Sequence, residues 1–123
     1  MVGGDTFDGS RLLAWCGEER LAVNLVRLFL EQVSTTLRGV DEHLGTGDAA
    51  GVAALAHKLK GAAGQLTADS ISTIAGMMVD TALAGNLGQG RELLEELRAE
   101  ARSFVAAASE ALGQSFDDAL VSR

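Results

Sequence analysis

His57 is the side chain in this sequence best suited to covalent chemistry. An imidazole is nucleophilic near neutral pH because its Nε2 atom carries a free lone pair in the neutral ring. Lys58 and Lys60 follow it closely in the sequence. When the segment is placed on a helix at about 100° per residue, His57 lies roughly 140° from the centre of the apolar stripe. We therefore predict that His57 points toward solvent.

The two sides of this helix differ in the size of their side chains. Its apolar residues fall within about 40° of one line, which is typical of a buried stripe. The stripe consists of Val52, Leu55, Ala56, Leu59, Ala63 and Leu66. The neighbours of His57 one and two turns away are Ala53, Ala54, Lys60, Gly61 and Gly64. Four of these neighbours, Ala53, Ala54, Gly61 and Gly64, are small, and we call them the collar. Because a glycine inside a helix costs about 1 kcal/mol relative to alanine, we interpret the collar as clearance for a molecule that approaches His57.

A resemblance to histidine-containing phosphotransfer (HPt) domains of bacterial multistep phosphorelays begins at His57. The family signature is His-any-(Leu/Ile)-Lys-Gly-(Ser/Ala)-(Ala/Ser). This sequence reads His57-Lys58-Leu59-Lys60-Gly61-Ala62-Ala63. All seven positions agree, and the resemblance covers roughly residues 7–112.

The resemblance implies a phosphorelay intermediate in which His57 is the phosphoacceptor. His57 would accept a phosphoryl group from a receiver-domain phosphoaspartate and pass it to an aspartate of a response regulator. The implied partners are a response-regulator receiver domain and a hybrid or sensor histidine kinase. The magnesium ion would belong to the receiver, so we expect no cofactor bound by this chain.

The two lysines have separate predicted roles. Lys60 lies one turn from His57 and could stabilise the charge of the phosphoryl group. A solubilising lysine at the edge of the stripe is an equally good interpretation of Lys60. Lys58 lies about 100° around the helix from His57 and is interpreted as a solvated or docking charge.

This sequence departs from the family at the residue that orients the histidine. HPt domains often carry a Gln or Glu on the following helix that hydrogen-bonds the second ring nitrogen. The most usual place for it corresponds to Val79, which has no polar side-chain atom. Asp80 could orient His57 if the register shifts by one residue, and a backbone carbonyl or water could also serve.

Two alternatives to a free-standing relay protein remain open. The chain could be an excised HPt module of a hybrid or chemotaxis-type histidine kinase, phosphorylated by an ATP-bound kinase domain. It could also be a non-catalytic helical adaptor. We expect no autonomous kinase activity, because the Gly-rich and Asn-containing boxes of a kinase ATP domain are missing. No set of ligands with metal-binding spacing joins His43 or Cys16, so we predict no metal site.

Charge and composition restrict the classes of partner. The chain has 123 residues and a formal net charge of −7, which disfavours nucleic-acid binding because that requires phosphate neutralisation. A single cysteine, Cys16, fits a reducing compartment. No apolar run is long enough to span a membrane. We therefore expect a cytoplasmic monomer that binds neither nucleic acid nor membrane.

Apolar periodicity predicts an all-α fold. Four amphipathic helices are predicted over residues 18–44, 48–66, 68–84 and 91–112, after a short helix at 7–16. Expected cap residues are Asp8 or Ser10, Thr46 or Asp48, and Thr67 or Asp69. Short connections between the helices favour an up-down-up-down four-helix bundle with a short extra N-terminal helix.

The predicted bundle occupies residues 7–112, between a flexible N-terminus at 1–6 and a tail at 113–123. Residues 84–90 are expected to be a loop because they are rich in glycine. We expect exposed apolar residues near His57 to dock the receiver. The candidates for docking or clearance are Leu12, Leu13, Ala53, Ala54, Lys58, Gly61 and Gly64.

Overall fold

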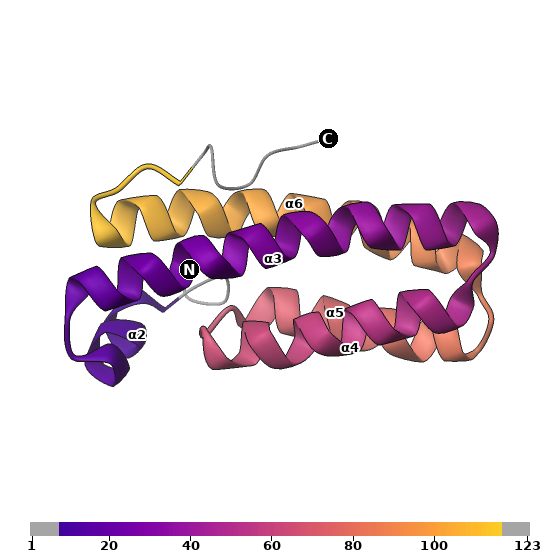
Figure 1. Cartoon of the computed structure of the whole chain (residues 1–123), viewed down its shortest axis with the longest axis horizontal. Coiled ribbons are helices and arrows are strands. Elements are labelled where there is room, and N and C mark those ends of the chain that lie inside the picture. The colour runs from indigo at the N-terminus through magenta and orange to yellow at the C-terminus, as the bar shows by residue number, and fades with distance from the viewer. Residues whose placement is uncertain (1–7, 117–123) are drawn as a thin grey trace.

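The structure is a computed structural model that describes residues 8–116 of the chain. These residues contain five helices (Figure 1). They are α2 (Gly9–Cys16), α3 (Glu19–Thr46), α4 (Ala49–Gln65), α5 (Asp69–Leu83) and α6 (Leu87–Leu112). The expected flexible segment at 1–6 lies outside the described residues. Figure 1 shows that α3 and α6 project past one end of the α4–α5 pair, and that α2 lies beside this projection.

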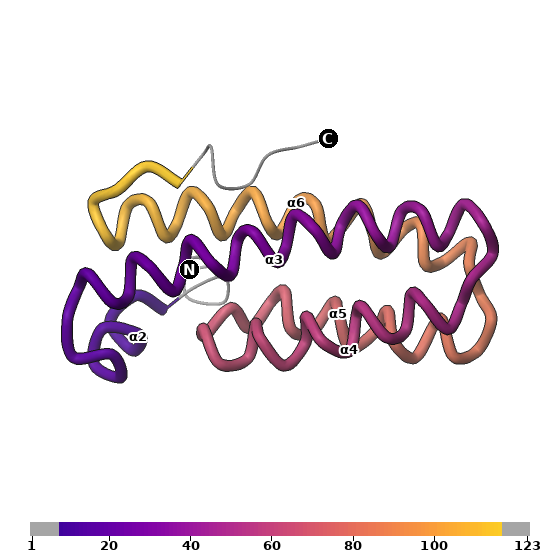
Figure 2. The backbone as a smooth tube through the Cα atoms, in the orientation of Figure 1, coloured from indigo at the N-terminus to yellow at the C-terminus, as the bar shows by residue number. Residues whose placement is uncertain are grey.

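The four long helices run up, down, up and down, and each contacts its neighbours along the chain, as the backbone trace in Figure 2 shows. The predicted all-α bundle with a short extra N-terminal helix is confirmed. One hydrophobic core runs through it, and Phe29 of α3 meets Phe104 of α6 edge to face with ring centroids 5.3 Å apart. Each helix turns one apolar stripe toward the core, and these stripes are the apolar faces of the amphipathic pattern seen in the sequence.

Short polar residues begin several helices by accepting a hydrogen bond from an otherwise unpaired backbone N–H. The Asp8 side chain accepts from Arg11 N, and the Asp48 side chain accepts from Gly51 N. Both cap predictions are confirmed. At the other end, Gly47 ends α3 in the left-handed conformation that glycine adopts without a Cβ clash.

Two connections differ from the expectation. Neither Thr67 nor Asp69 caps α5, whose N-cap residue is Ala68 without a side-chain hydrogen bond. The Thr67 hydroxyl is instead bonded to the backbone of Asp8. The glycine-rich loop is also shorter than predicted, because Asn86 caps α6 and the helix begins at Leu87.

The expected tail starts with residues that pack on the bundle. After α6 the chain doubles back along that helix (Figure 2), and Phe116 is 0% exposed. The Arg27 guanidinium lies over the Phe116 ring, 5.1 Å from its centroid, and also donates to Ser115 O at 3.3 Å. The Phe116 backbone N–H donates to Ser109 Oγ at 3.2 Å. Phe116 therefore contacts both α3, through Arg27, and α6, through Ser109, where these two helices project past the rest of the bundle.

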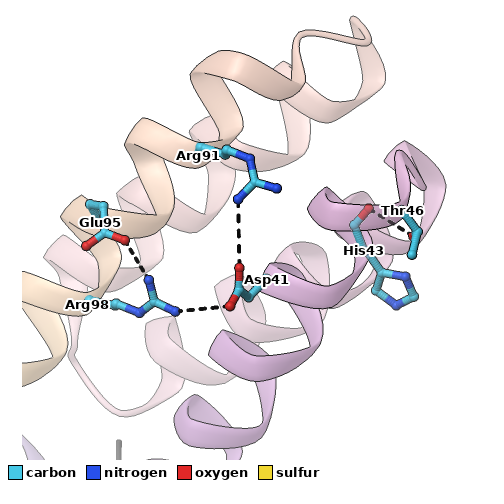
Figure 3. Close-up of polar contacts among 6 residues, drawn as sticks. All are labelled: Asp41, His43, Thr46, Arg91, Glu95 and Arg98. Carbon is cyan, nitrogen blue, oxygen red and sulfur yellow. Dashed lines mark hydrogen bonds and ion pairs between the residues drawn. The ribbon is translucent and has the colours of Figure 1, made fainter. Parts of the chain in front are cut away.

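An exposed ion-pair network joins α3 and α6 at the opposite end of the bundle (Figure 3). Asp41 lies 3.8 Å from Arg91 and 3.7 Å from Arg98, and Arg98 also contacts Glu95 at 2.6 Å. His43, in the last turn of α3, contacts Asp48 at 3.1 Å. These exposed pairs add little stability, so the apolar stripes account for most of the cohesion between the helices.

Candidate functional site

His57 lies in the middle of α4 and its side chain is exposed. The predicted stripe on the opposite side of α4 faces the core, with Leu55 half-buried and the other five members buried. The outward direction of His57 is therefore confirmed, and it follows from the stripe alone, since a residue about 140° from the stripe cannot enter the core.

His57 lines a groove of about 550 Å³ between α4 and α5. Its lining residues are His57, Lys60, Asp69, Ser72, Thr73, Gly76, Met77, Val79 and Asp80. The structure thus brings together the histidine, the lysine one turn along, and both positions that the sequence raised for an orienting partner.

Lys60 lies across Gly76 of α5. A Cβ added at Gly76 would be 3.5 Å from both Cδ and Cε of Lys60 and 3.7 Å from Nζ, so the lysine stem rests on this glycine. The Lys60 carbonyl accepts a hydrogen bond from Ser72 Oγ at 3.0 Å, which ties α4 to α5 at the same place. Within residues 8–116 no carboxylate pairs with the Lys60 ammonium, which is left available to an anion in the groove.

Val79 and Asp80 both line the groove that contains His57. Val79 has no group that bonds a ring nitrogen. Among residues 8–116 no hydrogen bond or ion pair joins Asp80 to His57. An orienting role for Asp80 therefore stays a prediction that the groove permits.

The collar around His57 is open where the sequence predicted clearance. A Cβ added at Gly61 would meet nothing within 4 Å, and one added at Gly64 would meet only Ser72 Oγ at 3.8 Å. Ala54 and Lys58 are exposed. Ala53 is only 8% exposed, so its predicted place on the open collar is wrong, because it belongs to the hydrophobic core.

Leu12, one of the two docking candidates on α2, needs a second correction. Leu12 is 0% exposed and Leu13 is half-buried, because α2 packs on α3 and α6 and needs an apolar residue at that contact. The large exposed apolar residue of α2 is Trp15, with 68% of its surface accessible. Trp15 lines a groove of about 460 Å³ together with Gly64 and Gln65, at the end of the helix that carries His57.

Sequence reasoning missed Trp15 because a large aromatic side chain is usually taken for core. Its spacing of three positions from the buried Leu12 added to this expectation, because residues i and i+3 lie on the same side of a helix. Within residues 8–116 no group of three or more His, Cys, Asp or Glu side chains is arranged to hold a metal ion.

The fold and site together are an antiparallel helical bundle that carries an exposed histidine and a lysine on one helix. The sequence matches the family described as Hpt domain over residues 24–111, and the chain belongs to this family. Family membership gives it a phosphotransfer role in a phosphorelay. Searches of curated proteins and of solved structures found no match. No helix within residues 8–116 is long and apolar enough to cross a membrane.

Proposed function

We propose that this chain is a phosphorelay intermediate that accepts a phosphoryl group on His57 from a receiver-domain phosphoaspartate and passes it to an aspartate of a response regulator. The observation that carries the proposal is the exposure of His57 on an open collar, next to a groove that holds the Lys60 side chain. An open site suits a residue that must reach the catalytic centre of another protein. A catalytic group used on a small substrate is more often enclosed.

The proposed transfer is an in-line displacement at phosphorus. The lone pair of His57 Nε2 attacks the phosphorus of the phosphoaspartate, the bond between phosphorus and the carboxylate oxygen breaks, and the carboxylate leaves with the electron pair. The proton on Nδ1 stays on the ring. In the second transfer a carboxylate oxygen of the response-regulator aspartate attacks phosphorus, the N–P bond breaks, and its electron pair returns to Nε2 of His57. The magnesium ion is supplied by the receiver in both steps.

Lys60 has a charge-stabilising role in this proposal. Its stem is supported by Gly76, and its ammonium lies in the groove that His57 shares. A phosphohistidine carries negative charge on its phosphoryl oxygens, and a lysine within one helical turn offsets that charge as a point cation. In a chain of net charge −7, Lys58 and Lys60 also make this face locally attractive to the acidic centre of a receiver.

Trp15 and the glycines of α4 form the proposed docking surface. Trp15 supplies a large apolar contact on α2, and Gly61 and Gly64 allow close approach along α4. A transient complex of this kind needs only a small interface, and aromatic residues are the usual anchors in such interfaces.

Gly61→Ala is expected to stabilise the domain while slowing transfer. The new methyl meets nothing within the chain, so the free energy of unfolding should rise by up to about 1 kcal/mol, the difference in helix propensity. The same methyl intrudes on the proposed docking surface, so the concentration of phosphorylated receiver that gives half-maximal transfer should rise. Thermal unfolding and initial transfer rates measure the two effects.

Gly45→Ala is the matched control, because Gly45 is also helical and a Cβ there also meets nothing within 4 Å. It lies in the last turn of α3, whose C-terminal end is at the end of the bundle opposite to α2 (Figure 1). It should stabilise the domain similarly and leave transfer unchanged. Equal transfer by both variants would contradict the clearance role of Gly61.

The proposed function is tested by incubating the full chain with a labelled phosphorylated receiver domain and magnesium. We expect label to appear on this chain in an acid-labile, base-stable form, as a phosphoramidate requires, and then to move to an added unphosphorylated receiver. A panel of receivers is needed because partner choice is a difference of affinities. If no receiver or kinase in the panel labels the chain, the helical adaptor replaces the relay as the interpretation.

A further inference from the structure

Thr67 occupies the turn between α4 and α5 in an unusual way. Its φ is +60°, and Thr67 is the one non-glycine residue with positive φ within residues 8–116. A β-branched residue rarely adopts this conformation, because its side chain crowds the backbone there. The residue is also only 7% exposed. Contacts elsewhere must therefore hold it in place.

Those contacts run to the start of α2. The Thr67 hydroxyl accepts a hydrogen bond from Asp8 N at 3.2 Å and donates one to Asp8 O at 3.3 Å. Both partners are on one residue, 59 positions away in the sequence. Asp8 is also the cap of α2, since its side chain accepts from Arg11 N at 3.0 Å. Thr67 thus holds the residue from which α2 begins.

The backbone of the same turn is bonded to the end of the helix that carries His57. Thr67 N donates to Gly64 O at 3.4 Å, and Ala68 N donates to Ala63 O at 2.9 Å. Thr67 also lines the groove that Trp15 and Gly64 share. A single side chain therefore connects the turn that follows α4 to the helix that presents Trp15.

The other tie at this junction is weaker. Arg11 lies 3.7 Å from Asp69, and both side chains are more than half exposed. Such an exposed ion pair is screened by salt and contributes little. The two hydrogen bonds of Thr67 are better placed, because they are partly buried. They are the main polar link between α2 and the α4–α5 turn among residues 8–116.

We propose that Thr67 is a positioning residue for receiver docking, which fixes α2 and its Trp15 at the correct place relative to His57. This inference rests on the proposed function. When the link is broken, α2 spends part of its time away from the docking position. The apparent affinity for the receiver then falls in proportion to the fraction of chains in which α2 is still in that position. The chemistry at His57 itself is left unchanged.

Thr67→Val tests the inference, since valine keeps the branched shape and removes both hydrogen bonds. The concentration of phosphorylated receiver that gives half-maximal transfer should rise about tenfold, the effect expected for two neutral hydrogen bonds. The rate at saturating receiver should stay within about twofold of wild type. Phosphorylation of His57 by phosphoramidate, a small donor that needs no docking surface, should also be unchanged.

Three further variants separate positioning from general damage. Thr67→Ser keeps the hydroxyl and should restore the wild-type half-maximal concentration. Thr46→Val removes a similar side-chain bond, from Thr46 Oγ1 to His43 O at 3.3 Å, at the other end of α3 and should have no effect on transfer. In a Trp15→Ala background, Thr67→Val should add no further loss, because both changes act through the same contact.

Three results would overturn the positioning role. They are an unchanged half-maximal concentration in Thr67→Val, an equal loss with phosphoramidate, or an additive loss with Trp15→Ala. Failure of the proposed function gives a different result, because the wild-type chain would then receive no label from any phosphorylated receiver. All transfer assays are run at a temperature at which circular dichroism shows Thr67→Val to be folded, and a loss in Thr67→Ser, which keeps the hydroxyl, would also contradict the inference.

Discussion

Replacement of His57 by glutamine is expected to abolish acceptance of the phosphoryl group, with a loss of at least roughly 10³-fold in the initial rate of label transfer. Glutamine is polar and close in size, but its amide nitrogen has no available lone pair for attack on phosphorus. Because the side chain is exposed and does not belong to the hydrophobic core, the variant should fold normally. Circular dichroism and the rate of transfer from a labelled phosphorylated receiver measure both points.

His43→Gln is the matched control, since His43 is the second of the two histidines in the chain. It lies in the last turn of α3 and contacts Asp48, outside the groove that contains His57. Transfer to this variant should equal transfer to wild type. If His57→Gln retained the label and His43→Gln lost it, the phosphoacceptor would be His43 on α3, and the assignment to His57 would be refuted.

Replacement of Phe116 by alanine is expected to lower the free energy of unfolding by about 3–5 kcal/mol, the range for truncation of a buried phenylalanine. The ring is completely buried and is covered by the Arg27 guanidinium, so truncation removes both a packed core contact and a cation–π contact. For a single small domain this loss is a large part of the total stability. Chemical denaturation followed by circular dichroism measures it.

Phe116→Leu is the matched control, because leucine keeps an apolar side chain of similar volume and should cost less than about 1.5 kcal/mol. The difference between the two variants isolates the cost of the empty space. An effect below about 0.5 kcal/mol for Phe116→Ala, the level of an ordinary surface substitution, would show that residues 113–116 do not pack on the bundle.

Much of the fold could be predicted because helix formation and burial leave a local pattern. Apolar residues three and four apart located four long helices, and short polar residues located two of the caps. The stripe through Val52, Leu59 and Leu66 also fixed the direction of His57, which depends on helix geometry alone. These inferences need no knowledge of what lies across the core.

Contacts between distant parts of the chain could not be predicted in the same way. Gly90 was expected in a loop, but it is buried in α6, where an added Cβ would be 3.1 Å from Leu44 Cδ2. The glycine allows close helix packing there. Thr67 and Phe116 were misjudged for the same reason, since their partners are Asp8 and Arg27. Tertiary contacts override local propensity at such positions.

Part of the candidate site could be predicted, because several of its residues lie on a single helix. His57, Lys60 and Gly61 lie on one helix, so their spacing places them directly. Leu12 was misplaced because the face that α2 presents depends on how it packs against α3 and α6. The partner that orients His57 also depends on the register of α5 against α4, which brings Val79 and Asp80 to the groove.

Trp15 has an optical consequence. The chain contains one tryptophan and no tyrosine, so its near-ultraviolet fluorescence comes almost entirely from a single indole. That indole is 68% exposed and lies at the edge of the proposed docking surface, so in the free protein its emission should be typical of an indole in water. Burial by a tryptophan-free receiver would shift the emission to shorter wavelength. The natural chain therefore carries an intrinsic reporter of partner binding, readable without label, before any phosphoryl group has moved.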